Sequence, residues 1–246
     1  MSPNPKYQVS KDPRPRRKPA SKAKQPKSRT RRVTKAAQRA EMMEQILDTA
    51  EELFSKHGLY GVTLKDVAKQ VGVHHTLMNY YFRDKKKLFD EVFARRAVVT
   101  STRRMRALDE YDAATKGKPT IEGALHTFLD TDLDLYIEGG KPWKNYGALA
   151  SQVANTPQWG AELMDKHFDP VVLKLIGLLK RALPHCSEED ILWGYHFVSG
   201  ALLLTLARTG RIDKLSNGKC KSDDFAAVKK RMAKFMAAGF MAVCGD

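Results

Sequence analysis

The chain has 246 residues, 42% of them hydrophobic, and a formal net charge of +15 at pH 7. This composition excludes a wholly disordered protein, and the length suits one large domain or two small ones. The charge is uneven, because residues 1–37 hold 13 Lys and Arg against one acidic residue, Asp12. The remainder of the chain is nearly balanced, so the excess charge belongs to an N-terminal arm.

Residues 1–37 are rich in Pro, Lys, Arg and Ser and poor in aliphatic side chains. Six prolines between Pro3 and Pro26 forbid a continuous helix, and the segment has too little apolar surface to offset the entropy of ordering. We therefore expect a disordered basic arm. Its charge suits contact with nucleic acid, and the alternative is a tail that only improves solubility.

The three cysteines, Cys186, Cys220 and Cys244, lie far apart in the sequence and show no metal-ligand spacing. We expect three reduced thiols and no metal or cofactor. The N-terminus lacks an apolar signal core, and the longest apolar run, Phe197–Ala207, is about half of a membrane span. These features predict a soluble cytoplasmic protein without a membrane partner.

From Gln38 the spacing of apolar residues becomes helical, and the first helix ends at Gly58. Thr63–Asp66 has the pattern of a capping box that opens a short helix to Gln70. A turn at Gly72 and a third short helix, His75–Phe82, follow. Asp84 is placed to cap a long helix from Lys85 to about Asp112.

Further helices are predicted over about 121–135, 143–153 and 157–183. Ser187–Asp190 reads as a second capping box, before a very apolar helix that extends to about Thr209. A polar loop, Gly210–Asp223, precedes a last helix over about 225–243. Since no alternating strand pattern of any length occurs, the predicted class is all-α with about nine helices. We expect a helix-turn-helix domain over residues 38–86 and a second helical domain over residues 87–246.

The segment Thr63–Phe82 has the features of a helix-turn-helix. Ala68 is small enough for close helix approach, and Gly72 can take the positive φ that the turn needs. The second helix would then present four side chains to a DNA major groove, His75, Thr76, Asn79 and Tyr80. An Asn side chain pairs with adenine through two hydrogen bonds, whereas Tyr and Lys side chains suit phosphates.

This segment resembles the DNA-binding domain of TetR-family regulators. The residues that match in type and spacing are Thr63, Val67, Ala68, Gly72, Val73, Tyr81, Phe82 and Lys85. The resemblance implies operator DNA as partner, and the candidate contact residues are Thr63, His74, His75, Thr76, Asn79, Tyr80, Tyr81 and Lys85. The chain departs from the family pattern at His74, Thr76, Met78 and Asn79, and a His is a poorer N-cap than the usual Ser. The adjacent His74 and His75 would point in different directions on a helix, which argues against a metal site.

The C-terminal half predicts dimerisation. The helix after Ile191 is apolar on nearly every side, so most of its faces must be buried. The last helix carries Ala237, Ala238 and Gly239, which permit close approach. Two such helices from each subunit would form a four-helix interface of a homodimer, and the alternative is that they complete a monomeric core. The phrases Ile191–Ala201 and Phe235–Phe240 resemble a TetR subgroup that includes regulators responding to long-chain fatty acids.

An effector pocket is expected within about Ile121–Thr209, where apolar and aromatic residues dominate. Each candidate lining residue could instead be plain core. They are Phe128, Trp143, Tyr146, Leu149, Phe168, Trp193, Tyr195, His196 and Ser199. Because no charged residue stands out as an anchor, we expect a mostly apolar small-molecule effector, such as a fatty acid or acyl derivative.

The sequence holds no Gly-rich phosphate loop, Gly-x-Ser-x-Gly or His-Glu-x-x-His motif, so we expect no enzymatic activity. The predicted function is a DNA-binding transcriptional regulator, most simply a repressor that an effector releases from its operator. The alternative is an architectural DNA-binding protein without an effector. The large C-terminal half favours the regulator.

Overall fold

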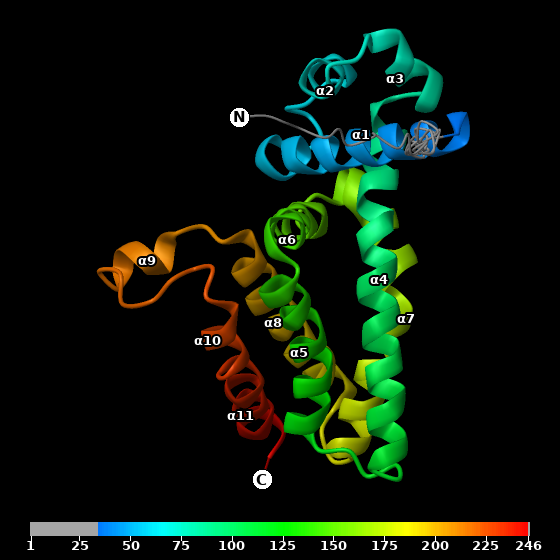
Figure 1. Ribbon diagram of the computed structural model, residues 1–246. Coiled ribbons are helices and arrows are strands. Elements are labelled where there is room, and N and C mark those ends of the chain that lie inside the picture. The colour runs from blue at the N-terminus through cyan, green and yellow to red at the C-terminus, as the bar shows by residue number, and fades with distance from the viewer. Residues whose placement is uncertain (1–33, 246) are drawn as a thin grey trace, which may run out of the picture.

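The computed structural model describes residues 34–245, which form eleven helices and no strand (Figure 1). The bounds are α1 Lys35–His57, α2 Leu64–Val71, α3 His75–Tyr81, α4 Lys85–Ala114, α5 Ile121–Glu138, α6 Gly140–Ala154, α7 Pro157–Ala182, α8 Glu188–Ala207, α9 Arg211–Leu215, α10 Phe225–Lys229 and α11 Met232–Cys244. The all-α class is confirmed, and the two helices beyond the expected nine are single short turns. Most of the predicted basic arm, residues 1–33, lies outside the described residues.

Helix α1 begins earlier than the expected Gln38. The hydroxyl oxygen of Thr34 accepts a hydrogen bond from the backbone N–H of Ala37 at 3.2 Å, which caps the helix. The expectation of disorder through residue 37 is therefore wrong for Lys35–Ala37, because an N-cap at Thr34 satisfies the first orphan donors of the helix.

Helices α1, α2 and α3 fold as the local signals predict. Thr63 and Asp66 form the reciprocal capping box, with distances of 3.2 Å for the Asp66 N–H and 2.8 Å for the Thr63 N–H. Gly72 ends α2 with a φ of 82°, a left-handed conformation that favours glycine. Met78 and Phe82 are fully buried, so the inner side of α3 is fixed against the core.

Helix α4 extends from the α1–α3 unit along the length of the second helical body (Figure 1). It packs on α1 at its start and on α5 and α7 further along. At the α1 contact, the buried carboxylate of Glu51 accepts hydrogen bonds from Arg95 at 2.9 Å and Arg96 at 2.8 Å. A buried charge without such partners would be strongly unfavourable, so this cluster fixes α1 on α4.

The last predicted helix, 225–243, is two helices in the structure. The helix is interrupted at Lys230 and Arg231, between α10 and α11. The apolar residues Phe225, Val228 and Met232 keep their helical spacing across this break, which explains why periodicity does not detect it. The predicted polar loop before α10 also contains the short helix α9.

Helix α8 is less buried than its composition predicts. Its length and apolar character would suffice to span a membrane, a property that core helices share. Only Ile191, Val198, Leu202 and Leu206 are buried, and a whole side of the helix remains exposed. This side carries Leu192, Trp193, Phe197 and Leu204. A single chain therefore does not supply the burial that this helix was expected to need.

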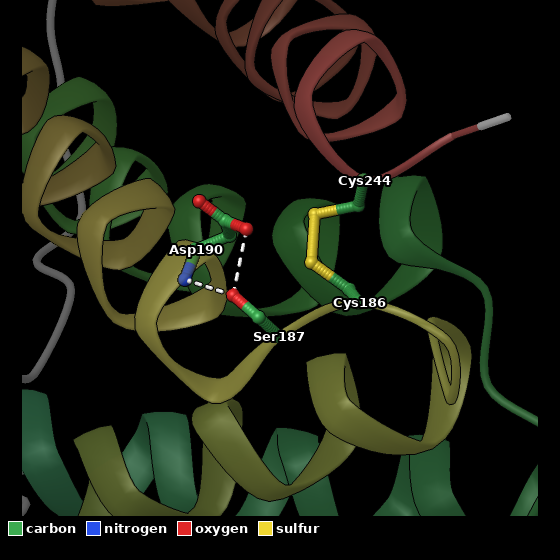
Figure 2. Close-up of a disulfide and its surroundings, with 4 residues drawn as sticks. All are labelled: Cys186, Ser187, Asp190 and Cys244. Carbon is green, nitrogen blue, oxygen red and sulfur yellow. Dashed lines mark hydrogen bonds between the residues drawn. A yellow bond between two sulfur atoms is a disulfide. The ribbon is translucent and has the colours of Figure 1, made fainter.

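The structure corrects the expectation of three reduced thiols. Cys186, on the turn after α7, forms a disulfide with Cys244 at the end of α11, and only Cys220 is free (Figure 2). The two bonded residues are 58 positions apart, so no local spacing announces the pair. The fold brings them together by packing α11 along α8 and α5. Next to the disulfide, the Ser187 hydroxyl caps α8 by accepting from the Asp190 N–H at 3.0 Å.

Replacing Cys186 with Ser should lower the free energy of unfolding by about 4 kcal/mol, because the disulfide restricts a long loop in the unfolded chain. Denaturant titration without reductant measures the change, and Cys220→Ser is the matched control with an unchanged midpoint. Equal midpoints for the Cys186→Ser protein and the unaltered protein would show that the bond contributes nothing.

Candidate nucleic-acid interface and internal cavity

Helix α3 presents a polar outer side. His74 caps it, with ring Nδ1 accepting from the Thr76 N–H at 3.4 Å and also contacting the Thr76 hydroxyl. His75, Thr76, Asn79 and Tyr80 are exposed, whereas Met78 on the opposite side is fully buried. The four side chains proposed for the major groove therefore share one accessible surface.

The other predicted contact residues flank this surface. Thr63 is exposed at the start of α2, and Tyr81 and Lys85 are half-buried at the end of α3 and the start of α4. The Thr63 side chain is occupied by its capping box with Asp66. The Lys85 ammonium lies 5.9 Å from the ring centre of Tyr60.

Arg39 is a member of this surface that sequence reasoning missed. Its guanidinium lies 5.6 Å from the ring centre of Tyr80 and 5.4 Å from that of Tyr81. This places a cation from α1 beside the aromatic end of α3, an arrangement that stabilises the rings and holds positive charge nearby. The position of Arg39 in the sequence does not indicate this contact, because α1 and α3 are separate helices that approach each other only in the folded chain.

More exposed cations lie on α2 and directly after α3. Lys65, Lys69 and Arg83 are exposed, and none of them has a salt bridge within residues 34–245. Unpaired cations around a polar helix face attract phosphate groups from both sides of a groove. The electrostatics of this end of the molecule suit a duplex.

The second candidate site is an internal cavity of about 70 Å³ between α4, α5, α6, α7 and α8. Five of the nine proposed pocket residues line it, Phe128, Tyr146, Phe168, Tyr195 and Ser199. Leu149 is fully buried and Trp143 is half-buried, but neither lines the cavity.

Trp193 and His196, also proposed as pocket residues, do not line this cavity. They are three positions apart on α8 and share its exposed side, whereas Tyr195 and Ser199 face the cavity. Trp193 is 53% exposed and lines a separate groove of about 480 Å³ between α8 and α11. An all-round apolar helix gives no sequence signal that tells these sides apart.

The cavity also contains charge, which corrects the expectation that none was buried there. Arg104 Nη2 lies 2.9 Å from Asp132 Oδ2, and both side chains are almost fully buried. Arg104 Nε donates to the Phe128 carbonyl at 3.1 Å, and the guanidinium lies 4.1 Å from the Phe128 ring centre. Each charged residue lies four positions from a buried apolar residue, Arg104 from Leu108 and Asp132 from Phe128. This helical spacing is the sequence signal that could have placed both side chains on inward faces.

Burial shifts the pKa values of the carboxyl and phenol groups that line the cavity. Burial raises the pKa of the Asp132 carboxyl above its ordinary value, and the charge of Arg104 opposes the rise. Burial also raises the pKa of Tyr136 and Tyr146, and the Asp132 carboxylate raises both further. Both phenols therefore stay neutral and can donate or accept hydrogen bonds.

Within residues 34–245, no group of three or more His, Cys, Asp or Glu side chains is placed to hold a metal ion. The rings of His74 and His75 lie with their centres 4.4 Å apart and are tilted by 40°, and neither residue belongs to such a group.

Comparison with known proteins matches two family models. Residues 46–92 match the bacterial regulatory proteins of the tetR family, and residues 126–239 match the tetracyclin repressor-like C-terminal domain. A curated relative, the biofilm operon icaADBC HTH-type negative transcriptional regulator IcaR of Staphylococcus aureus, is 38% identical over 50 residues. That match covers 20% of this chain and only 27% of IcaR.

Solved structures share the fold. A HlyIIR mutant protein aligns with a TM-score of 0.57 at 19% identity, covering 85% of this chain and all of that one. The fatty acid degradation regulator FadR from Bacillus halodurans aligns with a TM-score of 0.52 at 15% identity, covering 80% of this chain and 95% of FadR. The two family models together cover the first helices and most of the second helical body. The members of the matched family and the curated relative are transcriptional regulators rather than enzymes. The chain belongs to the TetR family of bacterial transcriptional regulators.

Proposed function

We propose that this chain is a dimeric repressor that reads its operator with α3 and leaves the DNA when a small, mostly apolar molecule enters the cavity. The observation that carries the proposal is the polar, exposed side of α3, opposite the fully buried Met78 and with Arg39 beside its aromatic end. Such a helix can enter a major groove without rearranging. A regulator of this kind works on the bacterial chromosome, so we propose a cytoplasmic location.

Each contact residue has a chemical role in this proposal. The Asn79 amide pairs with adenine, and the Thr76 methyl contacts thymine or its hydroxyl bonds a base edge. Arg39, Lys85 and the Tyr80 hydroxyl contact phosphates. We place the DNA-binding unit over α1–α3 and the start of α4, close to the predicted residues 38–86, and the effector and dimerisation unit after it.

The basic arm, residues 1–37, would extend this contact along the DNA. It ends at α1, whose Arg39 already lies beside α3. The thirteen cations of this segment, which directly precedes α1 in the sequence, support binding of the arm to the duplex. A tail that improves solubility remains the alternative role.

We propose that the partner subunit covers α8 and α11. Trp193, Phe197 and Phe235 are 53%, 60% and 75% exposed, and they line the groove of about 480 Å³ between these helices. Exposed aromatic side chains gathered at one groove are typical of protein interfaces. Two copies also match the two half-sites that this class of DNA reader needs.

A short chain of contacts joins the cavity to the DNA-binding unit. Tyr146 lines the cavity from α6, and α6 packs directly on α1. Gln152 on α6 donates to the Ser55 carbonyl on α1 at 2.7 Å, and Lys141 binds Glu52 at 2.9 Å. A ligand that displaces α6 would thus move α1, and it shifts the equilibrium only if it prefers that displaced state.

The effector class follows from the cavity lining, which is mainly apolar. A fatty acid or acyl derivative belongs to this class, and the structural neighbour FadR is by name a regulator of fatty acid degradation. A cavity of about 70 Å³ is smaller than the roughly 300–1,000 Å³ of sites for drug-sized ligands, so a long chain would require expansion. The alternative, an architectural protein without an effector, leaves the cavity with its buried ion pair unexplained.

Replacing Asn79 with Ala should weaken operator binding by about 1–3 kcal/mol, because one base contact is lost. Fluorescence anisotropy on DNA from upstream of the gene measures the change, with scrambled DNA of equal length as control. The dimer and the affinity for scrambled DNA should stay unchanged. Equal loss on both duplexes, or no loss on either, would contradict base reading by Asn79.

Replacing Phe197 with Glu should convert the dimer to monomers, because it places a charge in the proposed apolar interface. Leu173→Glu is the matched control, since Leu173 is 65% exposed on α7 away from this groove. Analytical ultracentrifugation gives the mass, and operator binding should fall together with it. A Phe197→Glu protein that remains dimeric would show that the interface lies elsewhere.

A further inference from the structure

The cavity is surrounded by buried polar atoms that lack partners. Within residues 34–245, Asp132 Oδ1, Thr100 Oγ1 and the Tyr146 hydroxyl have no hydrogen-bond partner, and each of these residues is at least nine-tenths buried. They come from three helices, α5, α4 and α6, yet all three residues line the same small cavity. A buried polar atom without a partner is unfavourable and rare in native proteins, so three around one cavity, beside the Arg104–Asp132 pair, indicate a missing polar ligand.

The chemistry of these atoms restricts the ligand. The guanidinium of Arg104 only donates, the ionised carboxylate of Asp132 only accepts, and the two hydroxyls do either. Arg104 and Asp132 also neutralise each other at 2.9 Å, so the site has no net charge to offer. The missing group must therefore donate to Asp132 and accept from Arg104 or a hydroxyl, without adding a charge.

We propose that the cavity binds a small molecule with an uncharged head that both donates and accepts hydrogen bonds, such as a primary amide or an alcohol. An amide N–H would reach Asp132 Oδ1, and its carbonyl oxygen would accept from Arg104 or Tyr146. A carboxylate would bring a second anion beside Asp132, and an ammonium would bring a second cation beside Arg104. This inference therefore narrows the proposed effector class to uncharged acyl derivatives and excludes the free fatty acid. That this molecule is also the effector rests on the proposed function.

The remainder of the cavity selects the body of the ligand. Most of the other lining residues are apolar, and none of them is charged; those from α7 and α8 include Met164, Phe168, Val172, Leu202 and Leu206. A volume of about 70 Å³ favours a short aliphatic or small aromatic body. Met164 is a flexible side chain that can adapt to modest differences in length. The head group thus determines which class of molecule is bound, and the apolar wall limits its size.

The test compares molecules that differ only in the head. Isothermal titration of the full chain at pH 7 with butanamide and hexanamide, and with butanoate and hexanoate, gives matched affinities. The amide of each length should bind at least about tenfold more tightly than the carboxylate, because an unmatched buried charge is excluded.

The decisive variant is Asp132→Asn, which removes the anion and keeps the shape. Arg104 is then unpaired, so the preference should reverse toward the carboxylate. Asp134→Asn is the matched control on the same helix, because Asp134 pairs with Lys229 outside the cavity and should leave the preference unchanged. If Asp132→Asn does not fold, Thr100→Val removes one hydroxyl of the site and should weaken amide binding without favouring the carboxylate.

A native preference for carboxylate, binding of neither class, or an unchanged preference in Asp132→Asn would overturn the proposal. Operator release is scored separately in the same samples. An amide that binds without releasing DNA would support the ligand class and contradict its role as effector. Specific DNA binding together with no amide binding would overturn this inference and leave the DNA-binding part of the proposed function intact.

Discussion

The structure depends on buried charge along one helix. Near its start, α4 holds α1 through Arg95 and Arg96 on the buried carboxylate of Glu51, and about 13 Å further along it holds α5 through Arg104 and Asp132. Replacing such pairs by apolar residues would often not reduce stability, but removing one partner costs about 3–5 kcal/mol. Their main effect is to fix the register of α4 against both neighbours, so the cavity and the DNA-binding unit are attached to one rigid element.

The exposed side of α8 and α11 is also held by a contact between distant segments. Helices α8 and α11 bury one side in the protomer and leave aromatic residues on the other. The disulfide between Cys186 and Cys244 holds the end of α11 beside the start of α8, at the edge of this face (Figure 2). A fixed angle between these helices would set how two subunits dock, and thereby how far apart their recognition helices lie.

Local signals in the sequence predicted the helices and the exposed polar side of α3, because their causes are local. The Thr63 capping box, the left-handed Gly72 and the buried Met78 each follow from neighbours within a few positions. The cavity was predicted in part. Tyr195 and Ser199 line it, but Trp193, on the same uniformly apolar helix, does not.

Other features depend on contacts between distant segments, and the sequence gives no sign of them. Arg39 meets Tyr80 across two helices, and Cys186 meets Cys244 across 58 positions. The pairing of Arg104 with Asp132 is of the same kind, because the spacing to apolar neighbours can indicate an inward face for each residue but not that the two residues meet. This pair also changes the chemical expectation for the ligand, from an apolar molecule in general to one with a particular kind of polar head.

The central claim is that a ligand in the cavity changes the separation of the two recognition helices. Pulsed electron paramagnetic resonance on a Cys220→Ser, Arg83→Cys protein, spin-labelled at position 83 just after α3, measures this separation directly. With operator DNA, the account predicts one narrow distance distribution, consistent with helices about 34–36 Å apart. Saturation with a molecule that binds in the cavity should shift or broaden this distribution, and an identical distribution with and without that molecule would contradict the account.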